Sequence, residues 1–403
     1  MEARIGLLPP AYMGRRMQYA LLSLSPIARD PDRLSYTLLS GEARLSSTEL
    51  KALAMQALGF ITASLRANQR NCRGPILAGV DCCSISGGPT LYTSGSNDKK
   101  ILENAGLAEC HIVKEARGRG KPGLTVGWTH AAVSYAHKVL EGRVDGGERR
   151  YDLPMLAKSS LFSRSRGYTG VWETRNYKVT LHELGTTLLG GAIAYLGRQR
   201  VSEGGDRGGS IEFYLLPDRP SGEYRALASL ASMGSLGGNL AARAARLART
   251  GVSLEAAISL AFAVMVDMYR SKLSGLNPAL VAGSARIYMV GTGQRPMIRG
   301  GIPISPAFYQ AYTRPTIRRL YNIATNAGGS LNDAAVNCIN KLFLQAQSGP
   351  HGDYILDCAR TLEGALSSLK GKEATSDLAE EARRLLESLH HEYFRIVVGE
   401  RIA

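Results

Sequence analysis

A chain of 403 residues, of which 44% are hydrophobic and 21% charged, can bury substantial cores, which excludes disorder as its main state. At roughly 100–200 residues per domain, this length predicts two or three domains. The formal net charge of +15 and the pI of about 9.6 favour a polyanionic partner, either nucleic acid or a membrane surface.

Extended runs and helical stretches alternate in the first half of the chain, which predicts a mixed α/β region. Apolar residues at helical spacing predict a helix over 47–68, where Ser47 or Thr48 can cap the first turn, and another over 128–140. A third helix is predicted over 181–199, followed by a strand at 211–217. Short strands are also predicted at 3–8, 75–80, 90–94, 110–114 and 124–126.

Pro217 and Pro220 end the strand at 211–217, and helical patterns dominate the chain beyond them. We therefore expect a mixed α/β domain over 1–220 with basic glycine-rich loops, and a mainly helical basic domain over 221–403 with an acidic terminal helix. The expected fold class is α+β, a mixed α/β N-terminal portion followed by a mainly helical C-terminal bundle. A strand is predicted at 286–291, and helices at 236–250, 253–266, 306–326 with a break before Pro315, 331–347, 354–369 and 377–393.

Arginine is concentrated in the helical half. The stretch from Arg225 to Arg319 carries twelve basic residues, eleven of them arginine, against two acids, Glu255 and Asp267. The planar guanidinium matches phosphate oxygens in geometry, so this stretch predicts a nucleic-acid-binding surface. Its candidate contact residues are Arg243, Arg246, Arg249, Arg295, Arg299, Arg314, Arg318 and Arg319.

Tyrosines accompany these arginines. Tyr309, Tyr312 and Tyr321 interleave with the last three arginines of the stretch, an arrangement in which stacking and charge can act together on unpaired bases. The competing interpretation is that these tyrosines are half-buried core residues.

Three glycine-rich basic loops interrupt the first half, at 115–123, 142–150 and 197–210. In the first of them Arg117, Arg119 and Lys121 lie close together without an acid, which predicts a phosphate contact. Arg164 and Arg166, between the second and third loops, are further candidates. Each loop can equally be a solvated connection between strands or helices.

Catalytic and cofactor motifs are missing from the sequence. GRGKPG at 118–123 lacks the spacing of a phosphate-binding loop, and the most basic stretch has too few acids for a two-metal nuclease. We therefore expect a binding protein with no catalytic residues and no cofactor. The alternatives are an enzyme that processes nucleic acid with His130, His137 or His182, and a structural protein that packages nucleic acid.

Six cysteines are scattered without a CxxC pair. They are expected to be free, buried and apolar in character, as is usual in a reducing compartment. A zinc site built from Cys72, Cys82 or Cys83, Cys110 and His111, or a disulfide, is the alternative.

The opening residues lack a secretory signal, which predicts a cytoplasmic protein. The longest apolar run, at 256–266, falls well short of the ~20 residues that a membrane span requires, so no membrane association is expected.

The helix LHELGTTLLGGAIAYLGRQ, the strand IEFYLLP and the helical second half together resemble the large subunit of the archaeal type I-A CRISPR interference complex, Cascade. The likeness is one of organisation and spans residues 180 to 395. It implies a non-catalytic subunit that assembles beside the Cascade backbone and small subunits on a CRISPR RNA. Such subunits recognise the protospacer-adjacent motif in target DNA, help to open the duplex and dock the helicase–nuclease.

Overall fold

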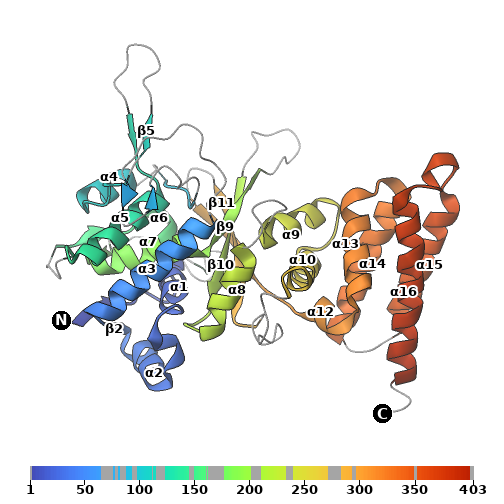
Figure 1. The fold of residues 1–403 in the computed structure, drawn as a ribbon, viewed down its shortest axis with the longest axis horizontal. Helices are drawn as coiled ribbons and strands as arrows, with labels where there is room; N and C mark the ends of the chain where they lie inside the picture. Colours follow the sequence, from blue (N-terminus) through green and yellow to red (C-terminus); the bar gives the residue numbers. More distant parts are fainter. Residues whose placement is uncertain are drawn as a thin grey trace, which may run out of the picture. The chain divides into compact units, whose positions relative to one another are not determined.

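The structure is a computed structural model of the whole chain. It confirms the α+β class: helices predominate, and the β-sheets are small and antiparallel (Figure 1). The described residues are 2–64, 76–77, 80–81, 88–92, 98–110, 112–114, 123–144, 149–159, 161, 177–200, 210–232, 239–270, 283–292, 296–348 and 352–399.

The chain divides into two compact units, and the division differs from the expected boundary at 220/221. The first unit comprises Met1–Gly237 and Ser284–Ile302, and the second comprises Gly238–Gly283 and Pro303–Ala403. The second unit is therefore interrupted by a β-hairpin that belongs to the first. The hairpin belongs to the first unit because its strand β11 (Ala285–Thr292) pairs with a strand far away in sequence. Local sequence patterns do not reveal such a pairing.

Helix α7 (Leu181–Ala194) lies against α1 (Met13–Leu22), α3 (Ser47–Ser64) and α5 (Trp128–Glu141) in the first unit. Its glycines allow this close packing. A Cβ at Gly190 would lie 1.8 Å from the backbone oxygen of Met17, and one at Gly185 would lie 2.2 Å from the ring of Tyr135. The glycine-rich sequence of this helix is thus a packing requirement.

The main sheet of the first unit has the strand order β12-β11-β10-β9. Its central strands β10 (Ser210–Pro217) and β11 (Ala285–Thr292) pair antiparallel from Ile211 opposite Gly291 to Pro217 opposite Ala285. The outer strands are β9 (Tyr195–Arg200) and β12 (Pro296–Pro303). The residues of β10 from 212 to 217 are all buried, as expected for a strand in the centre of a sheet.

Shorter elements complete the first unit. Strands β1 (Glu2–Gly6) and β2 (Glu42–Ser46) pair antiparallel, and the buried Gln18 side chain hydrogen-bonds the backbone of Gly6 and Leu8 beside them. The other antiparallel pairs are β3 (Ile76–Leu77) with β4 (Val80–Asp81), β5 (Ile112–Lys114) with β6 (Gly123–Thr125), and β7 (Tyr151–Asp152) with β8 (Lys178–Val179). The remaining helices are α2 (Pro31–Ser40), α4 (Asp98–Asn104), α6 (Met155–Lys158) and α8 (Gly222–Ser232), with a 3₁₀ turn at Pro26–Arg29.

The second unit is a helical bundle around α10 (Leu254–Met268). Its residues 256 to 267 are all buried, so this helix is enclosed by its neighbours, as its apolar sequence predicted. It contacts α9 (Leu240–Arg249), α12 (Ala307–Ala311), α13 (Arg314–Asn326) and α14 (Gly329–Ser348). Helices α15 (Asp353–Ser368) and α16 (Asp377–Gly399) complete the bundle, with a 3₁₀ turn at Gly371–Glu373 between them.

The start of α13 is capped from another helix. Glu392 of α16 has a side chain only 1% exposed, and its Oε1 accepts the backbone N–H of Thr313 at 2.5 Å. Arg395 neutralises the buried carboxylate from one turn further along α16, at 2.8 Å. One carboxylate thus satisfies a helix terminus and joins α13 to α16.

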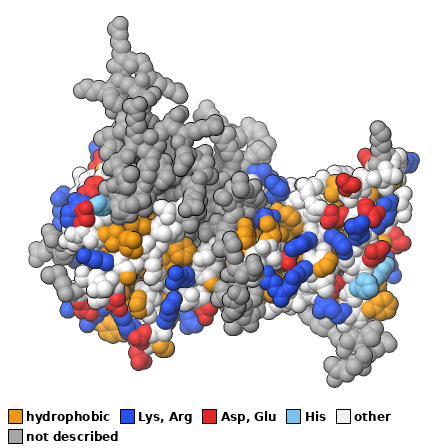
Figure 2. All heavy atoms as spheres, viewed as in Figure 1, with side chains coloured by type: hydrophobic (Ala, Val, Ile, Leu, Met, Phe, Trp, Pro, Cys, Tyr) orange, Lys and Arg blue, Asp and Glu red, His pale blue; other side chains and the backbone are white. Residues whose placement is uncertain are grey.

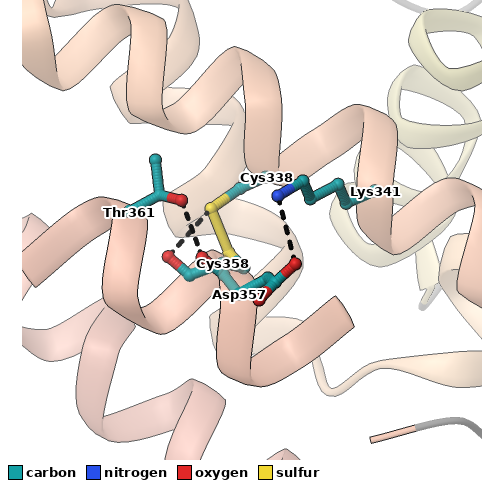
Figure 3. The surroundings of a disulfide bond; sticks show 5 residues. All are labelled: Cys338, Lys341, Asp357, Cys358 and Thr361. Atoms are coloured by element: carbon teal, nitrogen blue, oxygen red, sulfur yellow. Dashed lines mark hydrogen bonds and ion pairs between the residues drawn. A yellow bond between two sulfur atoms is a disulfide. The ribbon is translucent and has the colours of Figure 1, made fainter. Parts of the chain in front are cut away.

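A disulfide bond joins α14 to α15 (Figure 3). Cys338 and Cys358 are fully buried, and their Cα atoms are 4.8 Å apart. Next to it, Lys341 of α14 pairs with Asp357 of α15 at 3.3 Å. The expectation of free cysteines is wrong for these two residues, because the helical hairpin places side chains 20 positions apart face to face.

Several local expectations are also corrected. The helix expected over 181–199 ends at Ala194, because Tyr195–Arg200 pairs with β10 as strand β9. The cap of α3 is provided by Ser46 rather than by Ser47 or Thr48, since the Oγ of Ser46 accepts the N–H of Glu49 at 3.2 Å. No strand forms at 90–92 within the described residues, while 93–94 lie outside them.

Candidate nucleic-acid interface

The two units share the arginine-rich stretch. Arg225, Arg286 and Arg299 belong to the first unit, where Arg286 pairs with Asp218 at 3.1 Å and Arg299 is exposed on β12. The described arginines of the stretch in the second unit are Arg243, Arg246, Arg249, Arg270, Arg314, Arg318 and Arg319. The second unit therefore holds most of the predicted surface.

Helix α9 supplies one row of three arginines. Arg243, Arg246 and Arg249 follow each other at intervals of three residues, so they occupy one side of the helix, while Leu240, Ala244 and Leu247 are buried on the other. Arg246 and Arg249 are exposed. Asn239 caps the helix by accepting the N–H of Ala242 at 3.1 Å. The fan of arginines predicted from the sequence is thus confirmed in its geometry.

Arg314 and Arg318 lie one turn apart on α13 and both approach Asp267 near the end of α10. The Asp267 side chain is only 2% exposed, whereas those of Arg314 and Arg318 are 50% and 62% exposed. The Nε of Arg318 donates to Oδ2 of Asp267, and the Nε of Arg314 lies 3.6 Å from Oδ1. Asp267, one of the two acids of the arginine-rich stretch, therefore neutralises part of the positive charge of the stretch from a buried position.

Arg319 points elsewhere. Its guanidinium donates to the backbone oxygen of Arg384 at 2.9 Å and to the hydroxyl of Ser388, both on α16. This arginine joins two helices, which makes it a structural residue in its observed position.

The tyrosines divide between the two interpretations. Tyr312 is buried, donates its hydroxyl to the backbone oxygen of Leu342 at 2.8 Å, and has its pKa raised by burial, so it is a core residue. Tyr321 is half-buried with the guanidinium of Arg243 5.5 Å above its ring. Tyr309 is also half-buried and lines a pocket.

That pocket has a volume of about 450 Å³ and opens beside Asp267 in the second unit. Its walls come from α10 and the segment just beyond its end, from α12, from the junction of α12 and α13, and from the first turn of α13. The lining residues are Ala263, Asp267, Arg270, Tyr309, Tyr312, Thr313, Arg314, Pro315 and Ile317. Its size suits a small organic ligand.

We call Arg243, Arg246, Arg249, Arg270, Arg314 and Arg318 the arginine face. Within 239–270 and 303–326 the only acids are Glu255 and the buried Asp267. Figure 2 shows Lys and Arg side chains gathered over the part of the second unit that Figure 1 labels α9, α10 and α13, whereas Asp and Glu side chains are more frequent over α15 and α16. The surface potential here is positive.

Other predicted contact residues lie outside the described residues. These are Arg117, Arg119, Lys121, Arg164, Arg166 and Arg295.

The histidines proposed for an alternative enzyme are buried or paired on α5 and α7. His182 Nδ1 lies 2.9 Å from the Tyr135 hydroxyl, and burial lowers the pKa of His182. His130 is 4% exposed, and His137 pairs with Glu141 at 3.1 Å on its own helix. Among the described residues, no three His, Cys, Asp or Glu side chains are grouped as metal ligands would be.

Cys110, a member of the alternative zinc site, is disulfide-bonded and fully buried, so the expectation of a free cysteine is wrong here too. A disulfide sulfur has no thiolate to offer a metal ion, so Cys110 is not a zinc ligand in this state. Cys72, Cys82, Cys83 and His111 lie outside the described residues.

None of the helices in the described part of the chain combines the length and the apolar character that crossing a bilayer requires. No protein-family model, curated protein or solved structure matches the chain.

Proposed function

We propose that this protein binds nucleic acid through the arginine face of its second unit. The observation that carries the proposal is the charge distribution of α9, α10 and α13, where five arginines lie on α9 and α13, Arg270 follows the end of α10, and Asp267 of α10 is buried. Arginines at such spacing engage successive phosphates, and this supplies affinity without base specificity. The expectation that the protein is not an enzyme forms part of this proposal.

A narrower role follows from the resemblance to the Cascade large subunit. In that role the arginine face holds target DNA beside a CRISPR RNA, and the protein recognises the protospacer-adjacent motif without cutting. Its partners are the Cascade backbone and small subunits and the helicase–nuclease. The resemblance supports this role, and the arginine face supports only the binding of a polyanion.

Salt dependence tests the arginine face directly. We expect Arg243→Ala, Arg246→Ala and Arg249→Ala, combined in one variant, to weaken binding to duplex and single-stranded DNA. The slope of log Kd against log salt concentration should fall by about 0.9 for each duplex phosphate contact that is lost. Fluorescence anisotropy across a salt series measures both quantities.

A matched control removes the same charge elsewhere in the bundle. Arg360, Arg383 and Arg384 are exposed on α15 and α16, where Asp357 and Glu380 pair with them. The triple alanine variant of these residues should leave the salt slope nearly unchanged. Equal losses in the two triple variants would show that net charge alone attracts the nucleic acid, and would defeat the proposed site.

Reconstitution tests the narrower role. The protein is mixed with Cascade backbone subunits assembled on a CRISPR RNA, and binding is measured to target duplexes that differ only in the short flanking motif. Motif-dependent binding supports the role. Motif-independent binding together with self-assembly would instead indicate packaging, and cleavage of labelled RNA or DNA lost in a His182→Gln variant would indicate an enzyme.

A further inference from the structure

Asp267 is the buried acid beneath the arginine face, and two of the arginines meet at its carboxylate. The Nε of Arg318 donates to Oδ2, and the Nε of Arg314 lies 3.6 Å from Oδ1. The Asp267 side chain is 2% exposed, while half or more of each arginine side chain remains in solvent. A ligand can therefore reach the two guanidinium groups but not the carboxylate beneath them.

Each of these guanidinium groups keeps its two terminal nitrogens for another partner. Arg314 and Arg318 both approach Asp267 through Nε, and in the part of the chain that the structure describes their Nη1 and Nη2 atoms make no hydrogen bond to the protein. Arg319 differs, because its Nη1 donates to two groups of α16. The N–H groups of one guanidinium can form two parallel hydrogen bonds to a phosphate.

The spacing and the charge of this group fit one phosphate. Arg314 and Arg318 lie one turn apart on the same side of α13, and both guanidinium groups approach the same carboxylate. Two cationic side chains and one anionic carboxylate leave a single positive charge. This matches the single negative charge of a phosphodiester, which links the nucleotides of a strand.

The contact with Asp267 also prepares the two arginines for binding. An exposed arginine side chain has many rotamers, and a ligand that fixes it removes this freedom. Arg314 and Arg318 have already lost part of their freedom, because the buried carboxylate restrains the Nε of each. A phosphate that binds them therefore immobilises less of the side chain than it does at an unrestrained arginine.

We propose that Arg314 and Arg318 together hold one phosphodiester of a nucleic-acid strand, and that Asp267 positions their guanidinium groups for it. The inference rests on the proposed function and adds a phosphate site with a positioning residue. It runs against the expectation from charge alone, because an acid beside a phosphate site repels the phosphate.

The first test keeps every charge and removes only the guanidinium fork. In the double variant Arg314→Lys, Arg318→Lys, each ammonium can still pair with Asp267, but it cannot also present two parallel donors to a phosphate. The Kd for duplex and single-stranded DNA should rise about tenfold. The matched control makes the same exchange at two exposed residues of α9, as Arg246→Lys with Arg249→Lys, and should raise Kd less than about threefold. Equal losses in the two double variants overturn the inference.

The second test sets positioning against charge. Asp267→Asn and Glu255→Gln each remove one negative charge from α10, and Glu255 lies exposed in its first turn. Charge alone predicts tighter binding by both variants. Positioning predicts that Asp267→Asn raises Kd about threefold and lowers the salt slope by about 0.9, the value for one duplex phosphate contact, whereas Glu255→Gln does neither. A folded Asp267→Asn variant that binds as tightly as wild type, or more tightly, overturns the inference.

Removing the whole site counts the phosphates that it holds. The triple variant Asp267→Asn, Arg314→Ala, Arg318→Ala leaves no buried charge unpaired, and its salt slope for duplex DNA should fall by about 0.9. A fall of about 1.8 would show that each arginine holds its own phosphate, and an unchanged slope would show that neither arginine holds one. Either result overturns the inference, and the proposed function stands if the triple alanine variant of α9 still weakens binding. If the wild-type protein binds neither duplex nor single strand, the proposed function itself fails.

Discussion

Arg318 donates its Nε–H to the carboxylate of Asp267, so an exposed cation on α13 neutralises a buried anion on α10. The two residues are 51 positions apart in sequence. Removing a carboxylate from water costs several kcal/mol unless it is paired, and here the pairing arginines remain largely in solvent. The arrangement ties two helices of the bundle together and holds two arginines at the surface.

Loss of both arginines should be far more costly than loss of one. Arg318→Ala alone should lower the free energy of unfolding by about 1 kcal/mol, because Arg314 still faces Asp267. The double variant Arg314→Ala with Arg318→Ala should cost about 3 kcal/mol, since it leaves a buried charge unpaired. A urea-denaturation double-mutant cycle measures the coupling, and strictly additive single effects would contradict it.

Alanine should be tolerated at one helical glycine of the first unit and rejected at another. Gly190→Ala places a Cβ 1.8 Å from the backbone oxygen of Met17 and should destabilise the protein by about 3 kcal/mol. Gly59→Ala on α3 meets no atom within 4 Å and should stabilise it by about 0.5–1 kcal/mol through helix propensity. Thermal melts followed by circular dichroism distinguish the two; a Gly190→Ala melt equal to wild type would show that α1 can move away from α7.

Helices with a one-sided apolar pattern were predictable from the sequence, because their pattern records their burial. Helix α9 is an example, because it has an apolar stripe along one side. The break between α12 and α13 was also predictable, because Pro315 lies in the first turn of α13. The end of α7 was not predictable. Residues 195–200 continue the helical pattern of α7, yet they form β9 because strand β10 offers backbone partners there.

The arginine face was predictable in composition but only partly in its interactions. The spacing of Arg243, Arg246 and Arg249 places them on one side of a helix regardless of what surrounds it. The pairing of Asp267 with Arg314 and Arg318, and the turn of Arg319 towards α16, depend on how the bundle packs. The pocket was missed for the same reason, although an acid at the end of a long apolar run, as Asp267 is in α10, is a signal of a buried charge.

Acid should weaken the first unit through Glu49. Both oxygens of Glu49 accept hydrogen bonds from Arg33, at 2.7 and 3.2 Å, and the backbone N–H of Ser46 adds a further donor at 2.8 Å. These bonds to Arg33, above all, lower the pKa of Glu49 from 4.5 to about 2. The carboxylate thus stabilises the fold fully above about pH 4.5, and this contribution disappears as the pH falls towards 2.

Glu49→Gln should therefore lower the free energy of unfolding by about 1–2 kcal/mol at pH 7, a value reduced by the partial exposure of both side chains. The difference from wild type should shrink below pH 4.5 and vanish near pH 2. Denaturation at several pH values measures it. A Glu49→Gln deficit that is constant with pH would contradict the role of the charge.

Reduction of the disulfide should loosen the bundle without dissolving it. The bond between Cys338 and Cys358 closes a loop of about 20 residues, which limits the freedom of the unfolded chain by about 3 kcal/mol in the loop-entropy description. The folded hairpin of α14 and α15 also retains the ion pair between Lys341 and Asp357. We expect the Cys338→Ala, Cys358→Ala double variant to fold as the wild type does, but to unfold at lower denaturant concentration. Adding a reductant should shift the wild-type midpoint towards that of the variant and leave the variant's own midpoint in place. If the variant and the oxidised wild type unfold at the same denaturant concentration, the disulfide does not contribute to the free energy of unfolding.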